Sequence, residues 1–119
     1  MRIQESGENY LETILILKST QPEVHAIDIA NHMSFSKPSI SRALGILKKA
    51  GYIKIDRNGA IELTASGQKK ASKIYERHLT ITKFLVQLDV DVDLAEQDAC
   101  KIEHVISEET FQAIKRQVK

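Results

Sequence analysis

Three side chains near the C-terminal end of the chain have types and spacing that suit metal chemistry. Cys100 is the single cysteine, and Glu103 and His104 follow it by three and four positions. On a helix, residues at these separations share one face, so a thiol, a carboxylate and an imidazole would converge. Transition-metal ions accept all three ligand types. The spacing predicts a divalent-cation site, although a lone cysteine inside a helix is also often a small buried apolar residue.

Two earlier segments carry further candidate ligands. His78 lies in a long segment with apolar residues at every third or fourth position, which an antiparallel helical hairpin would bring alongside Cys100. Glu12 follows Asn9 by three positions in the first such segment, so both could face inward. A histidine on an apolar stripe is also typical of an ordinary core, so each of these features alone is a weak indication of a site.

The elements that must position these residues are mainly helical. Helical apolar spacing predicts a first helix over residues 4–19 and a short second helix over 26–33. Ser36 predicts an N-cap for a third helix with Pro38 in its first turn, and Gly51 predicts its end. The sequence therefore begins with three consecutive helices.

The periodicity then changes to alternation on both sides of Asn58-Gly59. This dipeptide predicts a β-hairpin because both of its positions tolerate positive φ. Three helices followed by a hairpin indicate a winged helix-turn-helix domain, which we assign to residues 1–63. Residues 64–119 are predicted to form an all-helical domain: a long helix capped by Thr64 or Ser66, a helix over 91–107, and a final helix from Ser107.

The long helix of this second domain carries an apolar stripe that leaves two interpretations open. Its members recur at three- or four-residue spacing, and they are Ala71, Ile74, His78, Ile81, Leu85 and Leu88. Such a stripe supplies either the contact surface of a dimer or the core within one chain.

Charge is distributed unevenly, which favours a polyanionic partner. From Ser36 to Gly59 there are six basic residues and one acid, a balance of +5, whereas the chain from Asp89 onward has eight acids and four bases, a balance of −4. A helix-turn-helix presents the start of its third helix to DNA bases and its wing to phosphates. The candidate DNA-binding residues are Ser36, Lys37, Pro38, Ser39, Ser41, Arg42, Arg57 and Asn58.

Composition indicates a soluble, cytoplasmic protein. No apolar run reaches the roughly 18 residues that a membrane span requires, and the N-terminus lacks the basic-then-apolar pattern of a secretory signal. One cysteine cannot form an internal disulfide bond.

The chain resembles the diphtheria-toxin-repressor and manganese-transport-repressor family of metal-activated transcriptional regulators. The resemblance covers nearly the whole chain in collinear order. It is carried by ENYLETILIL near the start, IANHMSFSKPSISRALGILKKAGYI, GAIELTASG at the wing, YERHLTITKFL in the long helix, and DACKIEHVISEE near the end.

The resemblance implies a repressor of metal-homeostasis genes that binds a palindromic double-stranded operator as a homodimer when Mn²⁺ or Fe²⁺ is bound. It implies metal ligands at Glu12, His78, Cys100, Glu103 and His104, with Asn9 as a further, uncharged ligand. Zn²⁺ or Co²⁺ would also bind in vitro, because a thiolate favours softer ions. Some members of the family add an SH3-like C-terminal domain; this chain stops at Lys119, and we expect it to be the short form.

The sequence departs from the family pattern at three positions. Asn9 stands where members carry methionine or aspartate, Glu96 where the iron-type branch has a histidine, and Thr82 where a glutamate is found in the long helix. The ancillary site of the iron-type branch is therefore expected to be incomplete.

Three other functions compete with this interpretation. A metal-independent winged-helix regulator of the MarR type would use Cys100 structurally or for redox chemistry. A protein-interaction module would show no DNA binding. A metal-dependent hydrolase is disfavoured, because the sequence has no nucleophile motif, no glycine-rich phosphate loop and no second acid–base pair. We expect the protein not to be an enzyme.

Overall fold

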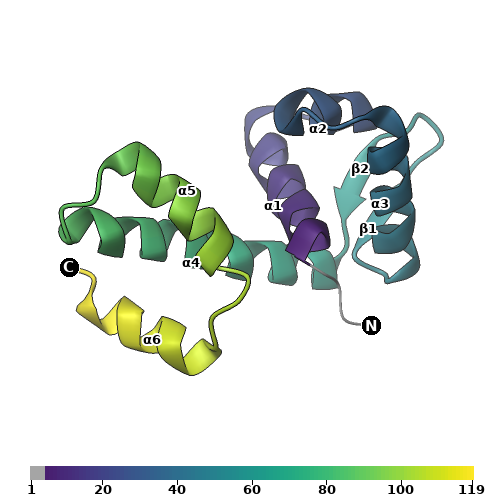
Figure 1. Cartoon of the computed structure of the whole chain (residues 1–119). Coiled ribbons are helices and arrows are strands. Elements are labelled where there is room, and N and C mark those ends of the chain that lie inside the picture. The colour runs from purple at the N-terminus through teal and green to yellow at the C-terminus, as the bar shows by residue number, and fades with distance from the viewer. Residues whose placement is uncertain (1–4) are drawn as a thin grey trace. The chain divides into compact units, whose positions relative to one another are not determined.

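A computed structural model of the chain describes residues 5–119 and is mainly helical, as predicted (Figure 1). Gln4, the expected start of the first helix, lies outside the described residues. The elements in chain order are α1 (Glu5–Thr20), α2 (Ala26–Met33), α3 (Lys37–Lys49), β1 (Ile53–Ile55), β2 (Ile61–Leu63), α4 (Ala65–Gln87), α5 (Val92–Ile102) and α6 (Glu108–Gln117). The chain divides into two compact units, Met1–Ser72 and Lys73–Lys119, with the division inside α4.

The N-terminal unit is a winged helix-turn-helix. Helix α1 packs against α2, α3 and β2, and β1 pairs antiparallel with β2. Its buried core combines Leu11 and Ile14 from α1 with Ile29 from α2 and Leu47 from α3, closed by Ile61 of the hairpin. Removing these apolar side chains from water is the main stabilising term of such a small unit.

Local sequence signals explain both ends of α3. Ser36 is its N-cap, and its hydroxyl accepts a bond of 3.4 Å from the backbone N–H of Ser39. At the other end Gly51 has φ 84°, and the backbone N–H of Tyr52 donates to the carbonyl of Leu47. This is a Schellman motif, for which glycine is favoured because it adopts positive φ without a steric penalty.

The wing is a hairpin, but its turn differs from the expected one. Ile55 pairs with Ile61, so residues 56–60 form the turn. Gly59 has φ 83°, while Asn58 does not adopt positive φ. The reason is Asp56, whose carboxylate accepts the backbone N–H groups of Asn58 at 2.8 Å and Ala60 at 3.0 Å. An acceptor inside the turn favours a longer loop with a single left-handed residue over a two-residue turn.

The first turn of α4 is fixed against the turn that follows α3. Thr64 is its cap, since its hydroxyl accepts the backbone N–H of Gly67 at 3.1 Å and donates to the carbonyl of Gly51 at 2.7 Å. A Cβ atom at Gly67 would lie 1.9 Å from the carbonyl oxygen of Tyr52. Only glycine therefore permits this close approach of two backbones.

The C-terminal unit consists of the rest of α4 with α5 and α6. Its core joins Ile81 of α4, Ala99 of α5 and Phe111 of α6. Asp91 caps α5 and Ser107 caps α6, each through its side-chain oxygen. The α4 stripe is largely intramolecular core, because Ala71, Ile74 and Ile81 are buried within the single chain, whereas Leu88 at its end is 59% exposed.

Candidate metal centre and nucleic-acid interface

The predicted ligands of the C-terminal unit lie on α4, on α5 and in the turn after α5. His78 is half-buried on α4, and Cys100 lies in the last turn of α5. Helix α5 ends at Ile102, so Glu103 is its C-cap and His104 lies in the following turn. The expectation of one helical face through His104 is therefore wrong. Residues 103–106 form the turn between α5 and Ser107, which is the N-cap of α6.

The carboxylate of Glu103 is the centre of this arrangement. Its Oε2 lies 2.9 Å from Nδ1 of His78, and its Oε1 lies 3.2 Å from Nε2 of His104. The side chains of Glu103 and His104 are 0% and 1% exposed. Oε1 makes no well-directed hydrogen bond, despite its short distance to His104. A dehydrated carboxylate with an unsatisfied oxygen is unfavourable unless a cation compensates it.

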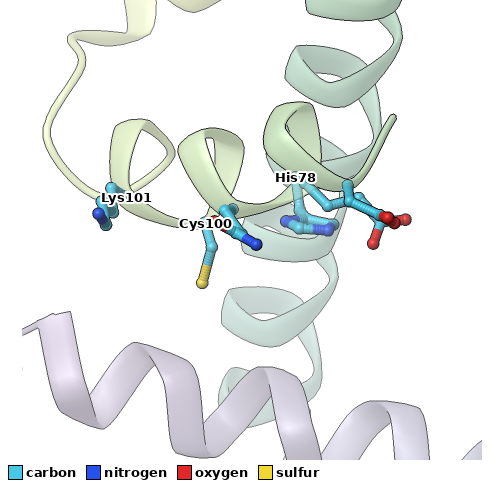
Figure 2. A pocket seen from close by; sticks show the side chains of 6 residues that line it. His78, Cys100 and Lys101 are labelled. Atoms are coloured by element: carbon cyan, nitrogen blue, oxygen red, sulfur yellow. The ribbon is translucent and has the colours of Figure 1, made fainter. Parts of the chain in front are cut away.

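Cys100 shares an open pocket with His78. Figure 2 shows His78 on α4 near Cys100 and Lys101 on α5. The pocket is lined by His78, Asp93, Glu96, Gln97, Cys100 and Lys101. The thiol thus lines the same pocket as an imidazole and two carboxylates. These are donor types that divalent transition metals accept. The residues present fit a metal ion.

Thr82 lies one turn after His78 on α4 and offers a hydroxyl rather than a carboxylate. Its hydroxyl donates a hydrogen bond of 2.7 Å to the backbone carbonyl of His78, one turn earlier on α4. Its side chain is thereby occupied with the helix backbone, and Glu96 supplies an acidic group in the same pocket as His78. The structure places the remaining two predicted ligands on α1 of the N-terminal unit, where Asn9 is half-buried and Glu12 is buried.

Arg77 lies next to the candidate centre and was not singled out from the sequence. Its guanidinium donates to the backbone carbonyls of Glu103 at 3.1 Å and Ile106 at 3.0 Å, and to the carboxylate of Glu108 at 3.0 Å. The only sequence signal was its position directly before His78, which is a weak indication because most helical arginines are solvated.

Every predicted DNA-binding residue is exposed and lies at the N-cap of α3, in its first two turns or in the wing. These residues are Ser36, Lys37, Pro38, Ser39, Ser41, Arg42, Arg57 and Asn58. The hydroxyl of Ser36 donates to that of Ser39 at 2.9 Å, so both serines also organise the start of α3. No acidic residue lies in the first turn of α3, and Lys48 and Lys49 occupy its last turn. The surface is therefore basic and free to meet a polyanion.

Comparison with known proteins agrees with both units. Residues 2–61 match the N-terminal DNA-binding domain of the iron-dependent repressors, and residues 64–119 match their metal-binding and dimerisation domain. The transcriptional regulator MntR of Escherichia coli is 33% identical over 112 residues, covering 94% of this chain and 72% of MntR. A helix-turn-helix regulator of Methanocaldococcus jannaschii is 31% identical over 95% of this chain and 92% of its own length.

Solved structures show the same fold. The manganese regulator SloR superposes with a TM-score of 0.83 at 27% identity, over 98% of this chain and 54% of SloR. A manganese-dependent transcriptional repressor in complex with manganese gives a TM-score of 0.86 at 25% identity, over 94% of this chain and 52% of that protein. The chain thus spans about half the length of these solved regulators.

The chain belongs to the iron-dependent repressor family, the metal-dependent transcriptional regulators that include MntR and the diphtheria toxin repressor. It combines a DNA-binding domain with a metal-binding and dimerisation domain, and the family consists of regulators rather than enzymes. The metal-dependent interpretation is favoured over the MarR-type alternative. None of the described helices combines the length and apolar character that crossing a membrane requires.

Proposed function

We propose that this protein is a metal-activated repressor that binds a palindromic operator as a homodimer and controls metal-homeostasis genes in the cytoplasm. The observation that carries the proposal is the buried carboxylate of Glu103 between the imidazoles of His78 and His104. That arrangement lies in the domain whose family model is defined by metal binding and dimerisation. A buried carboxylate flanked by two imidazoles offers ligand atoms that a divalent transition-metal ion accepts.

The proposed ligands are His78, Cys100, Glu103 and His104 of the helical part, with Glu12 and Asn9 from α1. The proposed ions are Mn²⁺ or Fe²⁺, since manganese is named for MntR-type structural relatives and iron for the family. When bound, the ion supplies positive charge that neutralises the carboxylates. A thiolate at Cys100 strengthens binding of softer ions, so Zn²⁺ and Co²⁺ are expected to bind in vitro.

Activation is proposed to work by a shift of conformational populations. Glu12 and Asn9 belong to the reading part of the chain, whereas the other ligands belong to the helical part. An ion that binds ligands from both parts would restrict the movement of α1. Because α1 and α3 share one core, the position of the reading helix α3 would be restricted as well. The coupling free energy between metal binding and DNA binding then equals a difference in metal-binding free energy. The two states compared are the DNA-competent state and the other state.

The functional division is proposed to fall between residues 63 and 64. The family models meet close to that point, since one ends at residue 61 and the other begins at residue 64. The compact units instead divide inside α4, because the first turns of α4 pack into the N-terminal core through Ala71. Helix α4 begins at Ala65, just after the proposed boundary, and is continuous across the division between the two compact units.

Operator reading is proposed for the exposed start of α3 and for the wing. Arg42 can present its guanidinium fork to a guanine edge in the major groove, and Arg57 can pair with a phosphate. The homodimer would place two such helices on two half-sites about one helical turn apart. Exposed apolar side chains of the helical part, among them Leu79, Leu88 and Leu94, supply area for the contact between subunits.

The proposal is tested by fluorescence anisotropy on a pool of palindromic DNA duplexes, first with chelator and then with Mn²⁺, Fe²⁺, Co²⁺ or Zn²⁺. Metal should strengthen binding at least about tenfold, which corresponds to about 1.4 kcal/mol of coupling. His104→Ala should lose this gain but keep the weak, salt-sensitive binding of the basic surface. Equal binding with and without chelator would contradict metal activation.

A further inference from the structure

Arg77 ties together both ends of the turn that carries two of the proposed ligands. We call residues 103–106 the ligand loop, because Glu103 and His104 belong to it. The Nη1 atom of Arg77 lies 3.1 Å from the carbonyl oxygen of Glu103 at the start of the loop and 3.0 Å from that of Ile106 at its end. A single nitrogen thus bridges the two ends of the loop.

The other contacts of Arg77 fix the guanidinium itself. Nη2 donates to Oε1 of Glu108 at 3.0 Å, at the start of α6. The guanidinium carbon lies 5.3 Å from the ring centre of Phe111, which belongs to the core of the helical unit. The side chain is only 15% exposed. These contacts hold the planar group in one orientation, and a lysine could not reproduce them because it has no fork of donors.

Two consecutive residues of α4, Arg77 and His78, therefore contact different atoms of Glu103. His78 meets the carboxylate of Glu103 at 2.9 Å, and Arg77 meets its backbone carbonyl at 3.1 Å. The carbonyl lies at the C-terminal end of α5, where carbonyl groups lack partners within the helix. A cation is also favoured at that end by the helix dipole.

We infer that Arg77 is a positioning residue for the metal centre: by bridging the carbonyls of Glu103 and Ile106 it presets the ligand loop for metal binding. The inference rests on the proposed function, because it takes Glu103 and His104 to be ligands. Arg77 itself does not bind the ion. It lowers the conformational entropy that the loop would otherwise lose when the ion binds. Groups that orient ligands in this way typically change metal affinity by about 10- to 100-fold.

The chain offers a matched control for a merely structural role. Lys115 of α6 pairs with Glu76 of α4 at 3.1 Å, so it also ties α6 to α4. The ion pair between Lys115 and Glu76 involves no residue of the ligand loop. Lys115→Ala therefore removes a link between the same two helices while leaving the loop contacts of Arg77 in place.

The test is titration of the full chain with Co²⁺, followed by calorimetry and by the visible absorption bands of the ion. Arg77→Lys should weaken Co²⁺ binding about tenfold or more and alter the absorption bands, which report ligand geometry. Lys115→Ala should leave affinity and spectrum unchanged. A wild-type affinity and spectrum in Arg77→Lys, or an equal loss in Lys115→Ala, would overturn the inference.

Two further variants keep the inference testable, one for the case that Arg77→Lys does not fold and one to check the ligand set itself. If Arg77→Lys does not fold, as judged by circular dichroism, Glu108→Ala serves in its place, since it removes the acceptor of Nη2 and so lets the guanidinium move away from the two carbonyls. It should weaken Co²⁺ binding by at least about twofold, and an unchanged affinity would overturn the inference. His104→Ala should bind Co²⁺ poorly. If wild type and His104→Ala bind alike, the proposed ligand set itself is wrong, and the role of Arg77 fails with it.

Discussion

The proposed metal binding depends most on one side chain, that of Glu103. Its carboxylate is withdrawn from water and meets an imidazole on each side, from His78 and His104. A buried anion is costly unless it is paired and fully hydrogen-bonded, and Oε1 lacks a well-directed hydrogen bond. A divalent ion would satisfy that oxygen and use the imidazole nitrogens, so the burial that is unfavourable for the free carboxylate favours the bound form.

Replacing Glu103 should therefore remove metal binding selectively. Glu103→Gln keeps the shape of the side chain and removes its charge, and we expect Mn²⁺ affinity to fall by at least about 100-fold. Calorimetric titration measures the change. Glu109→Gln, which alters an exposed glutamate of α6, is the control and should bind like the wild type. Unchanged affinity in Glu103→Gln would exclude this carboxylate as a ligand.

Arg42 tests the DNA-reading surface without touching the metal centre. It is exposed on α3, and Arg42→Ala should cost about 1–3 kcal/mol of operator binding in the metal-loaded state if its guanidinium reads a base. Metal affinity should not change. Arg116→Ala on α6 removes a comparable exposed charge from the helical unit and should leave operator binding nearly unaltered. A similar loss in both variants would mean that only overall charge matters.

At the scale of elements, short connections decide where the functional residues lie. The turn after α3, the wing and the ligand loop are each fixed by one polar side chain that binds backbone groups: Thr64, Asp56 and Arg77 respectively. Such contacts satisfy backbone groups that the ends of helices and strands leave without partners. The positions of α4, the wing and α6 follow from them.

Gly67 is a position where a side chain would collide with the backbone of the turn after α3. Its Cβ in Gly67→Ala would lie 1.9 Å from the carbonyl oxygen of Tyr52, so α4 must move away from the turn after α3. We expect a loss of about 2–3 kcal/mol in the free energy of unfolding, measured by urea denaturation. Gly45→Ala on α3 is the control: its Cβ meets no atom within 4 Å, and it should stabilise the helix by about 0.5–1 kcal/mol. Equal stabilities of the two variants would contradict the close approach.

The start of α6 predicts a pH dependence of stability. Hydrogen bonds from Gln112 and then from Arg77 lower the pKa of Glu108 from its ordinary value of 4.5. A carboxylate with a lowered pKa in the folded state contributes stability above its unfolded-state pKa, and this contribution is lost as the pH falls through the folded-state pKa.

Glu108→Gln should therefore be less stable than the wild type at neutral pH, with the difference disappearing in acid. Urea denaturation between about pH 7 and about pH 3 measures it. Because Glu108 is exposed, the effect should be small. A difference that grows on acidification would have the wrong sign and would contradict the lowered pKa.

At the scale of the whole molecule, function depends on coupling a metal centre to a DNA-reading surface. The ligands proposed in the helical part and those proposed on α1 belong to different parts of the chain. Under the proposed function, an ion bound by both sets would restrict the reading part. Homodimerisation then adds the second reading helix that a palindromic site requires.

Protons should oppose this coupling. Imidazole, thiolate and carboxylate bind metal only when deprotonated, so metal-activated operator binding should weaken between about pH 7.5 and about pH 5.5 at fixed free Mn²⁺. Anisotropy titrations at both pH values measure the change. Binding in chelator serves as the reference, because it reports the titration of the DNA-reading surface alone. An unchanged ratio of metal-bound to metal-free affinity would argue against histidine ligation.

Much of this molecule was predictable from local patterns. Helical periodicity, the Ser36 cap, the Gly51 stop and the Asn58-Gly59 turn gave the correct order of helices and hairpin, because each depends on residues close together in sequence. The same patterns predicted the basic surface of α3. Chemistry-bearing residue types at short spacing were enough to propose Cys100, Glu103 and His104 as ligands, and that assignment remains a proposal.

Only the tertiary structure decided how these residues meet. The contact of Glu103 with His78 and the contacts of Arg77 with the ligand loop join residues about 25 positions or more apart. The end of α5 at Ile102 was also not predicted. The single positive φ in the wing follows from Asp56 rather than from the dipeptide alone. Local sequence determines which elements form and, through residues such as Ser36 and Gly51, where some of them begin or end, because these hydrogen bonds are local. Packing determines which side chains share a site.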